Sequence, residues 1–547
     1  MKPGGAPALL WALALPGLAG CLRSEAAASA PVAAAPVAAA PVTAALDCRK
    51  PAHRISPLIY GVGYNELPAP DEALPWELGA TARRWGGNSS SRYNWRLGNA
   101  WNTGSDWFFR NVSYGGGKGP AYARFLEENR AHGVASALTV PLIGWVAKDT
   151  VSASFPVSRF GPQRAADHDA GDGLSAEGKP LAPGPPEQTS VAAPPSMIEA
   201  WVRRIRADGG GVRMYLLDNE PMLWHETHRD VHPQPVTYDE LLDRTLRYGA
   251  AVRSADPRAL IAGPALWGWP AYGYSAADAR AGFALHPDRR AHGDVPLLPW
   301  YLRKLREQEQ KTGVHLLDVV DVHFYPQADG IGGAHGRTEA EFAARRLRSV
   351  RGLWDASYSD ESYIGEPIRL LPRLREWIDE NDPGLGISIG EWNFGAARHP
   401  SGGLATAEAL GRFAEAGITA AFYWTAPPRG SPAFWAFRAF RDFDGAGAAF
   451  EDLFAGAVTQ DRLSVFISRN QAATRLVLVA VNGRDSAAEV RLRLEGCGAP
   501  AAVRRFVAAG ADFTLRAGDR LTPSQDAPAL LPPQSISVVE VQLASGR

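Results

Sequence analysis

The sequence has almost no net charge, few cysteines, and an N-terminal apolar run that is too short to cross a bilayer. Lysine and arginine number 57 against 58 aspartate and glutamate in 547 residues, so the formal net charge is −1. Nucleic-acid-binding surfaces are clearly basic, and this balance therefore argues against a nucleic-acid partner. Hydrophobic residues make up 46% and charged residues 21%, which is typical of a soluble globular protein. The length exceeds that of one typical domain and favours one large domain plus a smaller one.

The short apolar run, residues 9–15, follows Lys2 and leads into Leu-Ala-Gly-Cys at 18–21. A run of this length is typical of an export signal rather than of a membrane span. Its ending resembles a bacterial lipobox, in which cleavage precedes Cys21 and the sulfur carries lipid. An ordinary secretory signal that contains a cysteine is the alternative.

The stretch after this signal, residues 26–45, consists almost wholly of Ala, Pro, Val and Ser, which is typical of a tether. We therefore expect a signal peptide at 1–20 and a tether at 21–45. The protein is expected to be exported and lipid-anchored to the bacterial outer membrane or cell surface, or else secreted. Membrane contact is expected only through the N-terminal lipid.

Two further cysteines, Cys48 and Cys497, complete the set. In an exported protein a leftover pair favours a disulfide, here between the start of the folded region and its C-terminal part. Two unpaired buried thiols are the alternative.

From residue 58 to residue 424, short apolar runs alternate with amphipathic helical stretches. This alternation favours a parallel sheet, and eight runs are the number that a (β/α)8 barrel requires. The expected strands are 58–64, 81–85, 135–143, 213–217, 260–263, 319–324, 386–390 and 419–423. The expected helices include 238–254, 300–312, 372–380 and 405–416. We assign the barrel to residues 57–444.

After residue 444 the pattern changes to short β-type runs separated by turn residues, which predicts an antiparallel β-sandwich over 445–547. The runs are 463–467, 475–481, 489–494, 502–506 and 535–541. Residues 46–56 are expected to add a strand to this sandwich, where a bridge between Cys48 and Cys497 fits.

A long segment rich in Gly, Pro, Ala and Ser, residues 150–195, follows the third expected strand. Loops of this length are usually functional or disordered. We expect it to line or cover one end of a substrate cleft.

Two of the expected strands end in a glutamate. Glu220 follows the apolar run 214–217, and Glu391 follows 387–390. Barrel active sites lie at the C-terminal ends of the strands, so both carboxylates are expected to project into one bowl. Glycoside hydrolysis needs such a pair, with the carboxyl groups about 5–5.5 Å apart in a retaining enzyme and further apart in an inverting one. For each glutamate alone, a solvated loop residue is the alternative.

Polar side chains at other strand ends complete the candidate site. Arg84 ends the second strand and is expected to orient Glu391 and keep it ionised. Asn219 is placed to hydrogen-bond a sugar hydroxyl. His323 and Tyr325 end the sixth strand and are expected to position the carboxylates. The alternatives are structural roles: a strand-end cap for Asn219, an ion pair for Arg84 and a satisfied core histidine for His323.

Tryptophan is abundant, with 17 residues. An excess of tryptophan in an exported protein suits sugar binding, because the apolar C–H face of a pyranose stacks on indole. Trp424 ends the eighth strand, where its ring is expected to form the floor of the subsite next to the cleaved bond. Further stacking candidates, with core packing as the alternative, are Trp95, Trp145, Trp224 and Trp392.

Taken together, the chain from about residue 48 to residue 543 resembles glycoside hydrolase family 44, the endoglucanases and xyloglucanases. The motifs that carry the resemblance are Arg-Trp-Gly-Gly-Asn at 84–88 with Tyr-Asn-Trp at 93–95, Gly-Ser-Asp-Trp at 104–107, Gly-Trp-Val-Ala-Lys-Asp at 144–149, Leu-Asp-Asn-Glu-Pro at 217–221 with Leu-Trp at 223–224, Thr-His at 227–228 with His-Pro at 232–233, Asp-Val-His-Phe-Tyr-Pro at 321–326 and Gly-Glu-Trp-Asn-Phe-Gly at 390–395. The first of these adds Asn88 to the substrate-binding candidates.

The resemblance implies a barrel with an appended β-sandwich and internal hydrolysis of β-1,4-glucan backbones with retention. It assigns the acid/base to Glu220 and the nucleophile to Glu391. Positions 392 and 394 look like tyrosine positions in the family, and the 150–195 segment looks longer than usual. Because of these departures, the resemblance does not fix the contacts at the sugar subsites, the shape of the cleft or the preferred polymer.

Three alternatives stay open. His225, His228 and His232 have the spacing of one helical face and are a candidate zinc site, which would make the protein a metallohydrolase. Their order is His-Glu-Thr-His, not the His-Glu-x-x-His of zincins. The second alternative is a surface-tethered, non-catalytic glycan-binding protein, against which the presence of both glutamates argues. The third is a retaining hydrolase of xylan or mannan.

The expected partner is a β-glucan polysaccharide, and the expected assembly is a monomer. The hydrolytic chemistry requires no cofactor. A structural calcium or zinc ion is left open by the sequence.

Overall fold

The computed structural model of the protein describes residues 41–64, 73–114, 118–333, 336–519, 521–524 and 528–544. The expected signal peptide, the lipidation site at Cys21 and residues 21–40 of the expected tether lie outside these ranges. Among the described residues, no helix combines the length and apolar character that crossing a membrane requires.

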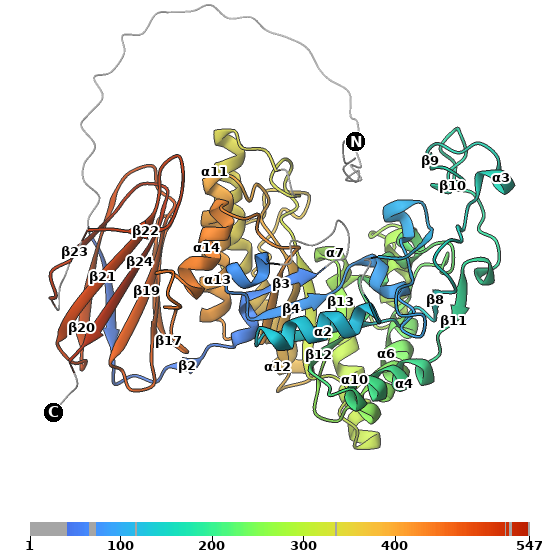
Figure 1. Cartoon of the computed structure of the whole chain (residues 1–547), viewed down its shortest axis with the longest axis horizontal. Helices are drawn as coiled ribbons and strands as arrows, with labels where there is room; N and C mark the ends of the chain where they lie inside the picture. Colours follow the sequence, from blue (N-terminus) through green and yellow to red (C-terminus); the bar gives the residue numbers. More distant parts are fainter. Residues whose placement is uncertain are drawn as a thin grey trace, which may run out of the picture. The chain divides into compact units, whose positions relative to one another are not determined.

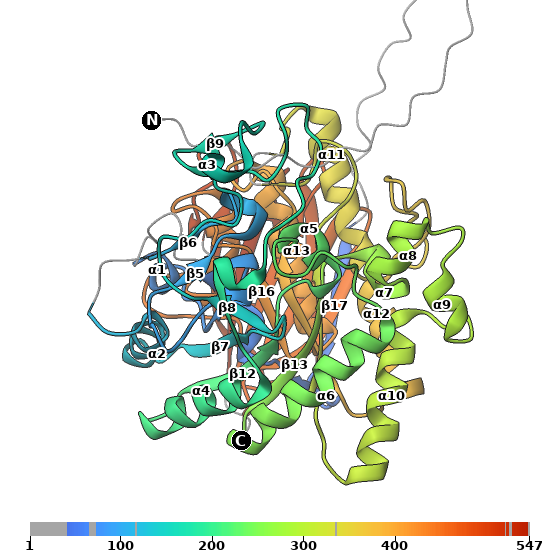
Figure 2. The ribbon, with the colours of Figure 1, turned by 90° about the vertical axis from the view of Figure 1, so that its right-hand side faces the viewer.

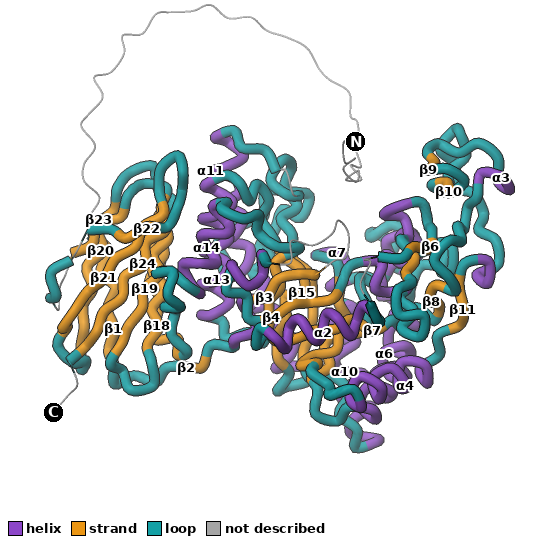
Figure 3. The backbone as a smooth tube through the Cα atoms, viewed as in Figure 1, coloured by secondary structure: helices purple, strands orange, loops and turns teal. Residues whose placement is uncertain are grey.

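Eight parallel strands close into a barrel, as the sequence predicts (Figures 1 and 3). Their order around the ring is β12-β13-β14-β15-β16-β3-β4-β7, so the last barrel strand, β16, pairs with the first, β3. The strands are β3 (Gly61–Tyr64), β4 (Ala82–Trp85), β7 (Ala135–Val140), β12 (Val212–Leu217), β13 (Leu260–Leu266), β14 (Val319–Phe324), β15 (Gly386–Trp392) and β16 (Ala420–Tyr423).

Several strand ends differ from the sequence prediction: β7 ends at Val140 and β13 continues to Leu266, and the ends of β3 and β15 differ as well. Residues 57–60 form the 3-10 helix η1 (Pro57–Tyr60) instead of starting the first strand, because the Ser56 side chain accepts the Leu58 N–H and a proline fits the first helical turn. β15 continues past residue 390 to Trp392, so Glu391 lies inside the strand.

Helices cover the outside of the barrel, and Figure 2 shows α4, α6 and α10 around it. The longer helices are α2 (Ala121–Ala131), α4 (Pro195–Ala207), α6 (Tyr238–Ala255), α10 (Leu297–Thr312), α11 (Ala340–Ser349), α12 (Leu370–Asn381), α13 (Pro400–Glu415) and α14 (Pro432–Arg441). The shorter ones are α1 (Leu74–Glu77), α3 (Val157–Phe160), α5 (Trp224–Thr227), α7 (Trp269–Gly273), α8 (Ala276–Ala281) and α9 (Pro287–Ala291). Further 3-10 turns are η2 (Asn88–Arg92), η3 (Gly104–Trp107), η4 (Pro186–Gln188), η5 (Pro221–Leu223) and η6 (Val350–Leu353). The predicted helical stretches fall in α6, α10, α12 and α13.

The C-terminal region forms two packed sheets. One has the order β2-β17-β18-β19-β24-β21-β22 and is antiparallel throughout, and the other has the order β1-β20-β23. The strands are β1 (Val42–Asp47), β2 (His53–Arg54), β17 (Leu453–Gln460), β18 (Leu463–Arg469), β19 (Arg475–Asn482), β20 (Ala488–Glu495), β21 (Pro500–Ala508), β22 (Arg516–Ala517), β23 (Pro528–Leu531) and β24 (Ser535–Leu543). A sandwich appended to a barrel is the predicted architecture.

The sandwich begins earlier in the chain than the sequence suggests. β1 starts at Val42, inside the stretch assigned to the tether, and pairs in parallel with β20. Val42, Ala44 and Leu46 are buried while the residues between them are not, which is the period of a half-buried strand. A composition of Ala, Val and Pro hides this alternation. Just beyond β1, Cys48 forms a disulfide with Cys497, which follows β20.

The barrel and the sandwich share one continuous apolar core. Phe466 and Val479 of the seven-stranded sheet belong to the same cluster of buried side chains as Phe413 of α13. Gly411 of α13 lies directly against the Phe466 ring, at a distance that leaves no room for a β-carbon. The two parts are therefore packed as one body rather than joined by a linker.

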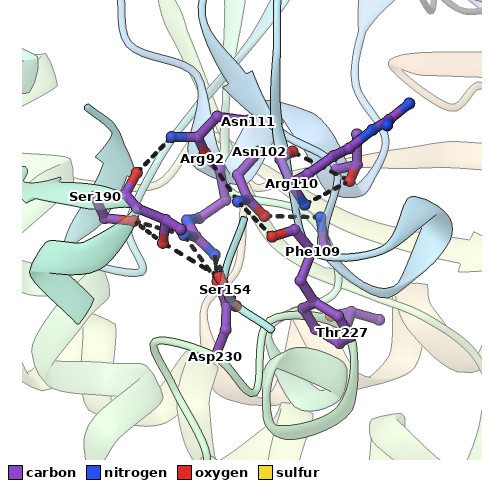
Figure 4. Close-up of polar contacts among 12 residues, drawn as sticks. Arg92, Asn102, Phe109, Arg110, Asn111, Ser154, Ser190, Thr227 and Asp230 are labelled. Atoms are coloured by element: carbon purple, nitrogen blue, oxygen red, sulfur yellow. Dashed lines mark hydrogen bonds and ion pairs between the residues drawn. The ribbon is translucent and has the colours of Figure 1, made fainter. Parts of the chain in front are cut away.

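The long segment after β7 is partly ordered as short strands: β8 (Trp145–Ala147) pairs with β11 (Ser190–Ala192), and β9 (Ala166–Asp167) pairs with β10 (Ala170–Gly171). A buried polar network fixes its base (Figure 4). Arg92 donates to Asp230 at 3.0 Å and to the Ser190 hydroxyl at 2.7 Å, and Ser154 donates to Asp230 at 2.7 Å. The extra strand pair β5 (Trp101–Asn102) and β6 (Asn111–Val112) packs beside it. That the segment borders a substrate cleft stays a prediction.

Candidate active site

Glu220 and Glu391 meet at the C-terminal ends of their strands. Glu220 lies in the turn after β12, and Glu391 lies near the end of β15, three places away around the ring. One carboxylate oxygen of each glutamate and one ring nitrogen of His323 all lie within 4.8 Å of one another. Retaining pairs have carboxyl groups about 5–5.5 Å apart and inverting pairs about 6.5–9.5 Å. The structure therefore brings the two predicted carboxylates together at close range.

Glu391 is held by a cation and a phenol. Arg84 Nη1 donates to Oε1 of Glu391 at 2.6 Å, and the Tyr325 hydroxyl donates to Oε2 at 2.8 Å. Burial alone would raise the pKa of Glu391, but the charges of His323 and Arg84, together with these two hydrogen bonds, outweigh burial and lower it. Glu391 is therefore an anion at neutral pH.

Glu220 has a different environment. Nδ1 of His323 lies 2.8 Å from Oε1 of Glu220 and 3.6 Å from Oε2 of Glu391. The Glu220 side chain is 15% exposed against 7% for Glu391. Burial lowers the pKa of His323, but the charge of Glu391 and the contact with Glu220 outweigh it and raise that pKa. One carboxylate is thus fixed by an arginine, and the other faces an imidazole and solvent.

The turn that carries Glu220 is set by Asp218, whose importance the sequence did not reveal. Asp218 is fully buried, and its carboxylate accepts the backbone N–H groups of Leu142, Ile143 and Asn219 as well as the Ser91 hydroxyl. Asp218 has φ 68° and Glu220 has φ 47°, both in the left-handed region. The carboxylate stabilises a backbone conformation that non-glycine residues rarely adopt.

A chain of hydrogen bonds leads from Arg84 to a third carboxylate. Arg84 donates to Oδ1 of Asn219 at 2.9 Å, Asn219 donates to Asn88 at 3.1 Å, and Asn88 donates to Asp106 at 3.1 Å. Solvent reaches the Asp106 side chain, yet the surrounding protein and the two glutamates raise its pKa to about 6, against the opposing effect of Asn88. Asp106 stands in a sequence motif, but only its position beside the pair marks it as part of the site.

Trp424 lies beside Arg84, and its role as the floor of a sugar subsite stays a prediction. Its ring occupies the space that a β-carbon on Gly63 or Gly87 would need, at 2.6 and 2.9 Å. The guanidinium carbon of Arg84 lies 5.8 Å from the ring centroid, and the indole is half-buried. The ring therefore borders the arginine that holds Glu391.

Two of the predicted stacking tryptophans are core residues, which corrects the prediction. Trp224 is 1% exposed and Trp392 is fully buried, so neither offers a face to a sugar. Side chains alternate along a strand, so Trp392 points away from the barrel interior when Glu391 points into it. Its partners are the rings of Phe413, Tyr423 and Phe437. Trp145 in β8 and Trp95, which packs nearby, are both half-buried, and their role stays a prediction.

His225, His228 and His232 do not form the helical face that their spacing suggests. α5 ends before His228, whose φ of −131° is not helical. His228 is fully buried with neither ring nitrogen hydrogen-bonded, and burial, with the charge of Arg92, lowers its pKa to about 3. His232 pairs with Glu240 at 2.8 Å instead.

Within the described residues, the group of acidic and histidine side chains close enough to hold a metal is Glu220, His323 and Glu391. Both oxygens of Glu391 already accept hydrogen bonds, and the Arg84 cation lies against one of them. A metal ion at this place would have to compete with these donors and lie near the Arg84 cation. A structural calcium or zinc ion elsewhere stays a prediction.

Comparison with known proteins agrees with this geometry. The model of glycoside hydrolase family 44 matches residues 100–328. Endoglucanase A of Paenibacillus lautus is 31% identical over 454 residues, which cover 78% of this chain and 62% of that protein. The chain thus spans less than two thirds of that relative's length.

Two solved structures are similar over nearly the whole chain. CelM2, a bifunctional glucanase-xylanase from a metagenome library, is 32% identical with a TM-score of 0.86, over 92% of this chain and 99% of that one. A Paenibacillus polymyxa xyloglucanase of family 44, solved with xyloglucan, is 26% identical with a TM-score of 0.76, over 92% of this chain and 100% of that one.

Proposed function

Because the chain belongs to glycoside hydrolase family 44, we propose that it cleaves internal β-1,4 bonds of glucans, with xyloglucan preferred, by a retaining double displacement. The observation that carries this proposal is the close pair of Glu220 and Glu391 with unlike surroundings. A single water molecule must fit between the carboxylates of an inverting enzyme, and the short separation supports direct attack by one of them.

In the first step, an oxygen of Glu391 attacks the anomeric carbon and forms a glycosyl ester, while the bond from that carbon to the leaving oxygen breaks. Glu220 gives its proton to the leaving oxygen. Arg84 and Tyr325 support this assignment, because they keep Glu391 ionised before attack and oriented during it.

In the second step, water attacks the same carbon and the ester bond breaks, which frees Glu391 as a carboxylate. Glu220, now the base, takes a proton from that water and is ready for the next cycle. Its contact with solvent and with His323, rather than with an arginine, suits a group that gains and loses a proton in each turnover.

The choice of glucan rests on the similar proteins, which include a glucanase-xylanase and a xyloglucanase. Xylan and mannan are the competing polymers. A reducing-sugar assay on carboxymethylcellulose, xyloglucan, mixed-linkage glucan, xylan and mannan separates them. Turnover of any one of these excludes a purely glycan-binding protein.

The roles of the two glutamates are tested by variants. Glu391→Gly is expected to lose turnover by about 10⁴-fold or more, with azide restoring it as a glycosyl azide of inverted configuration. Glu220→Ala is expected to keep attack on substrates with very good leaving groups, because these need no protonation. Glu226→Ala, an exposed neighbour, is the matched control. The same anomer from azide rescue of both variants would show that the roles are misassigned.

For the cellular location, we propose an exported lipoprotein that is anchored through Cys21 and works as a monomer without a cofactor. The disulfide between Cys48 and Cys497 supports an oxidising compartment. Cys21→Ala is expected to move the protein from the membrane fraction to the soluble fraction with activity intact. Recovery of the unmutated protein wholly in the soluble fraction would refute the anchor.

A further inference from the structure

A cavity lies where the barrel meets the sandwich. It has a volume of about 490 Å³ and is formed by α11, η6 and α13 on the barrel side and by the β17–β18 turn and the end of β19 on the sandwich side. None of its lining residues belongs to the catalytic group. Its size falls within the about 300–1,000 Å³ of small-molecule sites. We call it the junction cavity.

One wall of the junction cavity is an indole that is already held in place. Trp354 is half-buried, and the Arg412 guanidinium carbon lies 3.8 Å from its ring centroid. Arg412 is itself fixed by Glu408 at 2.8 Å, Glu415 at 2.6 Å and the Thr459 hydroxyl at 2.5 Å. One face of the indole therefore rests on a fixed cation, and the ring forms a rigid platform on the cavity side.

A carboxyl group with a free acceptor lies in the same wall. Oε1 of Glu408 accepts from Arg412 and, at 2.9 Å, from the Ser464 hydroxyl. The other oxygen has no partner among the described residues. Burial raises the pKa of Glu408 in spite of Arg412 and Ser464. An indole beside an unpaired carboxyl oxygen is a combination that binds a sugar ring, through its C–H face and one of its hydroxyls.

The charges around the cavity favour a neutral ligand. Arg351 donates to Asp355 at 2.9 Å, Arg348 pairs with Glu361 at 2.8 Å, and Arg462 lies 3.7 Å from Asp485, so each lining arginine has a carboxylate beside it. An anionic ligand would have to compete with these carboxylates. Neutral hydroxyl groups can share hydrogen bonds with both members of each pair.

From these contacts, we propose that the junction cavity is a second glycan-binding site, which takes a glucosyl unit of a neutral β-1,4-glucan chain away from the catalytic glutamates. The identity of the ligand rests on the proposed function. A chain held at a second point stays near the catalytic pair, which raises its effective concentration there. The site would therefore matter for polymers and not for short substrates.

Binding is tested on the whole protein with Glu391→Gln, which is expected to bind a cello-oligosaccharide without cleaving it. Calorimetry is expected to give two sites per chain. Adding Trp354→Ala is expected to remove one site and leave the other, and Glu408→Gln is expected to weaken the same site about tenfold. Glu408→Gln keeps an oxygen for Arg412 but turns the free acceptor into a donor.

Kinetics give an independent readout in the active enzyme. Trp354→Ala is expected to raise KM for soluble polymer several-fold and to leave kcat/KM for a short aryl cello-oligosaccharide unchanged. Trp354→Phe keeps an aromatic face and the contact with Arg412. A KM for polymer between those of the unmutated enzyme and Trp354→Ala would therefore show that stacking is lost in Trp354→Ala, not that the domain junction is disturbed.

One site per chain in the Glu391→Gln protein overturns the proposal, and so do two sites that both survive Trp354→Ala and Glu408→Gln. Failure of the proposed function is a different result, namely no hydrolysis of any β-1,4-glucan by the unmutated enzyme. The binding experiment remains readable in that case because it does not depend on turnover.

Discussion

Arg84 joins Glu391, the proposed nucleophile, to the rest of the site. Its guanidinium contacts Glu391 at 2.6 Å and Asn219 at 2.9 Å, and it is fully buried. A buried cation that serves two partners fixes both their positions and their charge. The carboxylate it holds is the one that we propose to attack as an anion.

Arg84→Met is expected to raise the pKa of Glu391, because burial then acts without the strongest opposing hydrogen bond and with one opposing charge fewer. A smaller fraction of Glu391 is ionised at acid pH, so the acidic limb of the kcat/KM profile moves to higher pH. Activity at the optimum should fall by about 10²–10³-fold.

The measurement is the pH profile of kcat/KM for Arg84→Met against that of Arg203→Met, an exposed arginine on α4 that serves as control. An acidic limb that stays in place, or moves to lower pH, would contradict the role given to Arg84.

The sequence identified residues whose role follows from their place at a strand end, and it missed residues whose role follows from contacts across the fold. Glu220 and Glu391 could be found because each ends an apolar strand. Asp106 and Asp218 could not, since their roles come from contacts made across the fold. Trp392 was misjudged because the predicted strand stopped at residue 390; β15 continues to Trp392, so the alternation that turns Glu391 inward turns Trp392 into the outer core.

At the scale of elements, the turn after β12 depends on the Asp218 carboxylate, which accepts hydrogen bonds from the backbone around it. Asp218→Asn is expected to cost about 1–3 kcal/mol, since an amide nitrogen would then face the N–H groups of Leu142 and Ile143. Glu220 would be displaced as a proton donor, so kcat should fall more for poor leaving groups than for good ones.

This split between leaving groups is the informative readout, because a merely destabilised enzyme would lose both activities equally. Asp208→Asn, at the exposed end of α4, is the control. Equal losses on both substrate types would show that Asp218 has no part in placing Glu220.

The disulfide ties β1 to the sheet of β20. Cys48→Ala is expected to lower the free energy of unfolding by about 2–5 kcal/mol, because the bridge closes a very long loop in the unfolded chain. The measurement is the denaturant midpoint with and without reductant. Reductant should lower the midpoint of the unmutated protein to that of Cys48→Ala and leave the variant unchanged; a midpoint indifferent to reductant in both would contradict this.

The barrel strands could be predicted nearly one for one, because strands buried on both faces are plain apolar runs. β1 and η1 could not. β1 is recognisable only from the alternating burial of Val42, Ala44 and Leu46 against β20, and η1 from its Ser56 cap. Both depend on partners that are distant in sequence or on single side chains.

At the scale of the whole molecule, two exposed aromatic rings stand in loops that follow barrel strands on opposite sides of the ring. Trp107 follows β4 and is 38% exposed, and Tyr363 follows β14 and is 65% exposed. β4 and β14 are four places apart in the ring of eight, so they lie across the barrel from each other. Trp107 adjoins Asp106 in the sequence. Burial, and next the neighbouring Tyr363, raise the pKa of Tyr272, whose hydroxyl donates to the His323 carbonyl.

Aromatic rings in loops on opposite sides of the barrel suit a polymer that runs across it rather than a terminal sugar in a pocket. Cleavage is therefore expected to be internal, so the viscosity of soluble xyloglucan should fall long before much reducing sugar appears. Trp107→Ala and Tyr363→Ala should each raise KM for polymer and shift the product lengths in opposite directions, because each weakens binding on one side of the cleaved bond. Viscometry run beside a reducing-sugar assay makes the comparison. Release of glucose or cellobiose alone, with viscosity falling only in proportion to product, would overturn the internal mode of attack.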